Sequence, residues 1–211
     1  MPETSGARIV QADSDAPQNP FLSGLHQPLR SEMTIDALDT TGTIPTALNG
    51  RYMRIGPNPM SADPDNYHWF AGDGMVHGLG IEAGQALWYR NRWIRSEAVS
   101  SALGEQRTEG PRNRTDNANT NVIGFAGRTF ALVESDSTPV ELSETLETLR
   151  YTDFQGGLRG SFTAHPHLDP KTSELHGICY DAAKPAAVRY VVVRPDATVR
   201  RGSLFPWSTG L

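Results

Sequence analysis

Apolar and polar positions alternate along much of the chain, and this pattern predicts short β-strands. Successive side chains of a strand point to opposite faces, so a period of two marks a half-buried strand. The pattern predicts strands over residues 50–55, 75–81, 86–94, 120–125, 128–134, 174–180, 187–193 and 198–204, with a short edge strand over 140–142.

Turn-forming residues separate these segments. Segments 75–81 and 86–94 flank the turn Glu82–Gln85 and predict a hairpin. Residues 97–106 are the best helix candidate. Many short antiparallel strands with frequent turns indicate an all-β fold, which could be a sandwich, a barrel or a propeller.

Composition narrows the class of protein. The 211 residues are enough for one domain with a core, and the net charge of −5 argues against a nucleic-acid-binding surface. The single cysteine, Cys179, excludes an intramolecular disulfide and a cysteine-rich zinc site, and it fits a reducing cytoplasm. Its apolar neighbours predict a buried strand residue rather than a nucleophile.

The polar residues 1–20 predict a flexible N-terminal arm, and residues 21–211 the folded part. No apolar run approaches the length of a transmembrane helix. We therefore expect a cytoplasmic protein, and a peripheral membrane contact stays open.

The segment from Ser161 to Pro170 concentrates candidate chemistry, because it holds His165 and His167. On a strand these two side chains would share one face, and imidazole is the commonest protein ligand for metals. The pair is therefore either part of a metal site or two solvated histidines. A compact site would combine both with a carboxylate, Asp169 or Glu134, in a facial triad.

Several segments match one family in the same order. They are Gly50–Pro59, His68–His77, Tyr89–Trp93, Asn119–Asn121, Ala131–Glu134 and Gly160–His167. The ordered set resembles the carotenoid cleavage oxygenases, from about Pro20 to the end of the chain.

The resemblance implies a seven-bladed β-propeller with a non-haem Fe(II) on its axis, one ion per full-length subunit. Four histidines from four blades hold the iron. Members of the family use O2 to split a carbon–carbon double bond into two carbonyl products. Their substrates are carotenoids, apocarotenoids or, in one branch, stilbenes.

Two residues take roles through the resemblance. The Thr-Ala-His-Pro motif implies that His165 is the first iron ligand, and His167 becomes a neighbour with a packing or second-shell role. Glu134 matches a glutamate that accepts a hydrogen bond from an iron-bound histidine of a later blade, which orients that ring. Stilbene-cleaving members tend to carry a lysine near Val133, so the apolar valine favours a polyene substrate.

One ligand of four, and fewer than half of the blades, predict an N-terminal fragment. We expect an unclosed propeller that is inactive alone. Four aromatic residues could line a polyene tunnel, although strand spacing favours the core: Trp69, Phe70, Trp88 and Trp93.

Two other functions compete with this interpretation. One is the compact His/His/carboxylate metalloenzyme, and the other is a non-catalytic, propeller-like interaction module. Iron binding that depends on His167 would favour the first of these.

Overall fold

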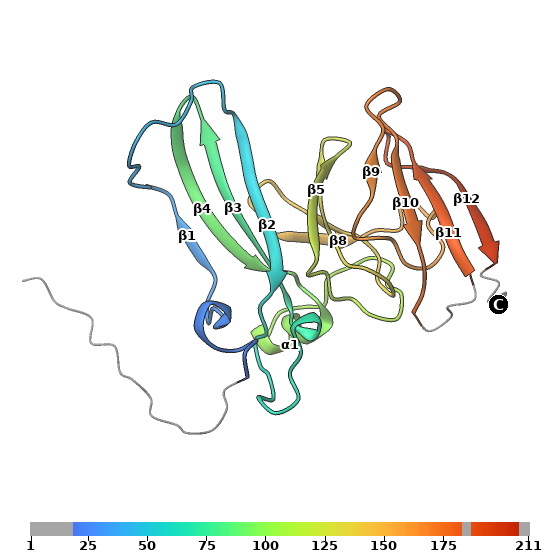
Figure 1. The fold of residues 1–211 in the computed structure, drawn as a ribbon, viewed down its shortest axis with the longest axis horizontal. Helices are drawn as coiled ribbons and strands as arrows, with labels where there is room; N and C mark the ends of the chain where they lie inside the picture. Colours follow the sequence, from blue (N-terminus) through green and yellow to red (C-terminus); the bar gives the residue numbers. More distant parts are fainter. Residues whose placement is uncertain (1–18, 183–186, 207–211) are drawn as a thin grey trace, which may run out of the picture.

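A computed structural model describes residues 19–182 and 187–206, which form three four-stranded antiparallel sheets (Figure 1). This arrangement confirms the predicted all-β class. The predicted arm over residues 1–20 lies outside the described residues apart from its last two positions.

The first sheet has the order β1-β4-β3-β2. Its strands are β1 (Met33–Ile35), β2 (Gly50–Pro57), β3 (Gly74–Glu82) and β4 (Gln85–Trp93). Strands β3 and β4 form the predicted hairpin. Short 3-10 helices, η1 (Gly24–His26) and η2 (Trp69–Ala71), lie before and after β2.

The α-helix α1 (Glu97–Leu103) follows the first sheet and is shorter than the predicted 97–106. Ser96 caps its N-terminus by accepting a hydrogen bond from the Val99 amide. Gly104 has a left-handed φ of 68° and ends the helix at a conformation that glycine adopts without strain.

The second sheet is a meander of β5 (Asn121–Phe125), β6 (Arg128–Leu132), β7 (Val140–Leu142) and β8 (Thr148–Tyr151). The prediction that β7 is an edge strand was wrong. Strand β8 pairs with its free side, so β7 lies between β6 and β8 and all three of its residues are buried.

The third sheet is also a meander, formed by β9 (His167–Leu168), β10 (Leu175–Cys179), β11 (Ala187–Val193) and β12 (Val199–Pro206). In Figure 1 the first and third sheets lie on the two flanks, with the second sheet between them. The edge strands β2, β5 and β9 appear towards the middle of the view, and β1 and β12 appear on its outer sides.

The second sheet is covered on both faces, which explains its apolar strands. Along β6, Phe130 and Leu132 join a core cluster with Leu175 and Val193 of the third sheet. Ala131, on the opposite face, joins a cluster with Val76 of the first sheet. The period-two alternation of β6 therefore divides its side chains between two neighbouring sheets.

Within the described part of the chain, no helix is both long and apolar enough to cross a membrane.

Candidate metal centre

His165 lies in an irregular segment, residues 161–166, between β8 and β9. Strand pairing begins only at His167, opposite His176 of β10. A strand through both histidines, the condition under which His165 and His167 would share one face, is therefore not present. Pro166 has no N–H to give to a β-ladder, which is consistent with the late start of β9.

This segment has no β-ladder. Contacts with the second and third sheets fix its position instead. The Phe162 amide donates to the Ser137 carbonyl oxygen at 3.0 Å, and its ring is buried in the core cluster. Asp181 accepts a hydrogen bond from the Ser161 amide at 3.1 Å. The backbone that leads to His165 is thus fixed at its start.

Glu134 is hydrogen-bonded to the same segment, at the two residues directly before His165. Its Oε2 accepts hydrogen bonds from the Ala164 amide at 3.1 Å and from the Thr163 hydroxyl at 3.3 Å. The Thr163 oxygen in turn accepts a hydrogen bond from the His165 amide at 3.2 Å. Glu134 follows β6, so its carboxylate joins the second sheet to the segment that enters the third.

Asn121, the first residue of β5, contacts the segment from the other side. Its Nδ2 donates a hydrogen bond to the Ala164 carbonyl oxygen at 2.8 Å. Our sequence interpretation assigned no role to Asn121 or to Thr163. The threonine two positions before His165 was a readable signal, because a threonine hydroxyl often bonds the backbone two residues on.

The His165 side chain fits the role of a metal ligand, provided that the other ligands of the metal come from elsewhere in the protein. The residue is exposed, and its ring makes no hydrogen bond among the described residues. Over residues 19–182 and 187–206, no three His, Cys, Asp or Glu side chains come together in a way that could hold a metal ion. His165 therefore fits one corner of a metal site, and its described neighbours do not complete that site.

The compact triad is not assembled in the structure. His167 is exposed on β9, where a packing role finds no support. The Asp169 carboxylate accepts hydrogen bonds from the Lys171 amide at 2.8 Å and the Thr172 hydroxyl at 2.9 Å, which lower its pKa. The Asp169 carboxylate thus stabilises the turn between β9 and β10.

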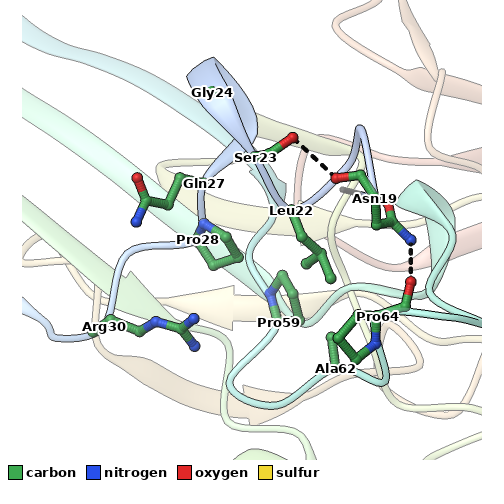
Figure 2. Close-up of a pocket in the computed structure, with 10 residues that line it drawn as sticks. All are labelled: Asn19, Leu22, Ser23, Gly24, Gln27, Pro28, Arg30, Pro59, Ala62 and Pro64. Atoms are coloured by element: carbon green, nitrogen blue, oxygen red, sulfur yellow. Dashed lines mark hydrogen bonds between the residues drawn. The ribbon is translucent and has the colours of Figure 1, made fainter. Parts of the chain in front are cut away.

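A cavity of about 500 Å³ lies apart from this segment (Figure 2). Figure 2 shows two hydrogen bonds in the lining of this cavity. The Ser23 hydroxyl donates to the Asn19 carbonyl oxygen, and Asn19 Nδ2 donates to the Pro64 carbonyl oxygen. Among the described residues, Arg30 is the one charged side chain in its lining, and neither His165 nor Glu134 contributes to it. This cavity therefore does not extend the candidate metal centre.

The aromatic residues divide between core and surface. Trp93 is buried and donates from its indole nitrogen to the Asn58 carbonyl oxygen at 2.8 Å. Trp88 packs against a core cluster. The expectation of a core position was wrong for Phe70, whose exposed fraction is 81%. Its place in η2, outside any strand, removes the strand spacing on which that expectation depended.

Cys179 is buried in β10, as predicted. Desolvation by burial raises the pKa of its thiol to about 12. A nucleophilic cysteine needs a thiolate near neutral pH, so Cys179 is a packing residue.

A family model described as retinal pigment epithelial membrane protein matches residues 26–208. The chain belongs to this family, that of the carotenoid cleavage oxygenases.

Several curated members resemble the chain over most of its length. The carotenoid cleavage oxygenase of Mycobacterium tuberculosis is 47% identical over 198 residues, which cover 92% of this chain and 40% of the relative. The resveratrol cleavage oxygenase 1 of Aspergillus fumigatus is 38% identical over 180 residues, covering 79% of this chain and 36% of the relative. The chain thus spans about 40% of the length of these family members.

Solved structures of the family share the fold. The lignostilbene dioxygenase of Pseudomonas brassicacearum matches with a TM-score of 0.76 and 30% identity, over 92% of this chain and 44% of that one. The cobalt-substituted ACO of Synechocystis matches with a TM-score of 0.67 and 22% identity, over 85% of this chain and 43% of that one. The prediction of N-terminal blades of a seven-bladed β-propeller is confirmed, and each of the three sheets is one blade.

Proposed function

We propose that the protein containing this chain is a non-haem Fe(II) dioxygenase that cleaves a carbon–carbon double bond to carbonyl products. The family and the activities for which its members are named support a cleavage dioxygenase. The observation that carries the assignment is His165, an exposed imidazole that follows Ala164, whose amide and carbonyl are both hydrogen-bonded to side chains of another blade.

In this proposal His165 supplies one of four imidazole ligands, and the others come from outside this chain. A histidine binds a metal through a neutral ring nitrogen, and the uncommitted ring of His165 meets that need. Bound Fe(II) would supply the chemistry that activates O2. His165 contributes a fixed position, because its preceding residue cannot shift without breaking bonds to Glu134 and Asn121.

We assign to Glu134 two tasks, one for each carboxylate oxygen. Oε2 holds Thr163 and Ala164. Oε1 has no hydrogen-bond partner among the described residues, and in our proposal it accepts a hydrogen bond from an iron-binding histidine of a later blade. A carboxylate in that place would fix the tautomer of the ring and raise its basicity.

The substrate we propose is a carotenoid or an apocarotenoid. The relative with 47% identity is named a carotenoid cleavage oxygenase, and Val133 offers no charged group to a phenol. A stilbene is the alternative, favoured by the likeness to the lignostilbene dioxygenase.

The proposal further includes a cytoplasmic location, supported by the single, reduced cysteine. A peripheral membrane contact would give the protein access to apolar substrates. We also propose that the 211-residue chain is inactive without the rest of the protein, since it supplies only His165 to the metal.

The test compares two histidine variants of the whole protein. We expect His165→Ala to lose its stoichiometric iron and its alkene cleavage, while His167→Ala keeps both. Metal analysis gives the iron content, and chromatography of an apocarotenoid and of resveratrol after incubation gives the products and the substrate class. Loss of iron in both variants would favour the compact triad, and retention of iron by His165→Ala would contradict our proposal.

A further inference from the structure

Asn121 and Glu134 hold the two backbone polar groups of one buried residue, Ala164. Glu134 takes the amide, and Asn121 donates to the carbonyl oxygen at 2.8 Å. That carbonyl belongs to the peptide bond that joins Ala164 to His165. Because a peptide group is planar, a hydrogen bond that fixes this carbonyl also fixes the plane from which the His165 backbone continues.

The structure offers few other ways to orient His165. Residues 161–166 take no part in a β-ladder, and the ring of His165 has no hydrogen-bond partner among the described residues. The direction of its Cα–Cβ bond therefore depends on the preceding backbone. Thr163 and Glu134 define the amide side, and Asn121 is the side chain that defines the carbonyl side.

Asn121 is itself firmly placed. It begins β5 and pairs with Leu132 of β6, the strand that leads to Glu134. One side chain that holds Ala164 thus lies on β5, and the other follows β6, the neighbouring strand of the same blade.

We propose that Asn121 is a positioning residue for His165, and that it sets the geometry of the metal site through the Ala164 carbonyl. The inference rests on the proposed role of His165 as an iron ligand. It goes beyond that role, because it assigns a part of the metal affinity to a side chain that does not touch the metal. Outer-shell partners of this kind commonly change metal affinity by about 10–100-fold.

The test uses Asn121→Asp in the whole protein. The substitution keeps the shape of the side chain, removes its two donor hydrogens, and sets a carboxylate oxygen against a carbonyl oxygen. We expect Fe(II) binding to weaken by about 10–100-fold in a competition titration with a chelator. We also expect the visible bands of the Co(II)-substituted protein to shift, because these bands report ligand geometry without any turnover.

Asn117→Asp is the matched control. Asn117 lies in the same approach to β5, and its Nδ2 donates to the Gly72 carbonyl oxygen at 2.7 Å, in contact with the first blade rather than with Ala164. The same chemical change there removes the same kind of bond. We expect a comparable fall in Tm, with the iron affinity and the Co(II) bands unchanged.

The outcomes separate the two proposals. Asn121→Asp with wild-type iron affinity and Co(II) bands would overturn the positioning role while leaving the role of His165 intact. Retention of iron by His165→Ala would overturn both. Should Asn121→Asp not fold, Asn121→Ser removes the amide without adding charge, and the same shift in the Co(II) bands is expected.

Discussion

The Thr163 hydroxyl makes two bonds at once, to the Glu134 carboxylate and from the His165 amide, and the residue is only 4% exposed. We expect Thr163→Val to lower the free energy of unfolding by about 1–3 kcal/mol, because it leaves the His165 amide without its acceptor and removes one of the two hydrogen bonds to the half-buried Glu134 carboxylate. Chemical denaturation of the whole protein measures this. Thr163→Ser keeps the hydroxyl, so its free energy of unfolding should fall clearly less. An equal fall in both variants would contradict the role of the hydroxyl.

His77 of β3 should make the stability of the fold depend on pH. Burial, together with the charge of Arg54, lowers the pKa of this imidazole below 6.5, and its Nδ1 lies 2.8 Å from the Tyr89 hydroxyl. Above pH 6.5 the ring is neutral in both the folded and the unfolded state. Below it the unfolded state binds a proton that the folded state resists, so stability falls as pH drops towards the lowered pKa.

The measurement is the Tm at pH 7.5 and at pH 5.5. We expect the wild type to lose more Tm across this range than His77→Gln, which cannot take up the proton. An equal loss in both would show that His77 does not contribute to the pH dependence.

The family resemblance of the sequence predicted roles for His165 and Glu134, but the sequence could not predict the contact between Asn121 and Ala164. These residues are 43 positions apart, and no local pattern relates them. The bond exists because β5 and the segment before β9 belong to neighbouring blades.

Among the strands, the period-two pattern predicted those that have one face on a core, such as β3, β4 and β10. It missed the short strands β1, β8 and β9, and it misjudged the position of β7 in its sheet. A three-residue strand such as β7 carries too few positions to show whether one or both sides are paired. Residues 161–166, for which the pattern predicted no strand, have backbone hydrogen bonds to side chains such as Glu134.

The start of β3 depends on the absence of a side chain at Gly74. A Cβ there would lie 1.9 Å from the Ala118 carbonyl oxygen, which is backbone and cannot rotate away. We expect Gly74→Ala to lower the free energy of unfolding by more than about 3 kcal/mol, or to prevent folding, through overpacking. Thermal unfolding and the soluble yield are the measurements.

Gly124 of β5 is the matched control, because nothing lies within 4 Å of a Cβ built on it. Gly124→Ala should be neutral or stabilising by up to about 1 kcal/mol, since alanine restricts the unfolded chain more than glycine does. Similar losses for both variants would exclude the steric explanation for Gly74.

The third blade has an apolar outer face, on the side away from the second blade. Ile178 is 57% exposed and Tyr180 is 38% exposed, while Cys179 between them is buried against the core. The relatives extend well past the matched length, since the chain covers only 40% of the M. tuberculosis protein. A next blade packed on this face would bury Ile178.

Thermal and chemical unfolding of the whole protein can test this packing. We expect Ile178→Thr to lower the free energy of unfolding by about 1–2 kcal/mol, the loss typical of buried apolar atoms. Leu149→Thr is the control, because Leu149 lies on the edge strand β8 and is 52% exposed. Leu149→Thr should change the free energy of unfolding by no more than about 0.5 kcal/mol. Equal effects would show that Ile178 stays exposed.

The hydrogen bonds from the second blade to Ala164 restrict which chimeras of this fold can keep the metal site. Blades can be exchanged between related propellers as modules, with crossovers in the connections between sheets. A crossover between β8 and β9 would inherit His165 from one parent and Asn121 and Glu134 from the other, although these residues meet at one peptide. An exchanged unit therefore has to include residues 121–165, which cross the boundary between the second and third sheets. Chimeras that respect this unit should retain metal more often than chimeras cut at the visible boundary between sheets.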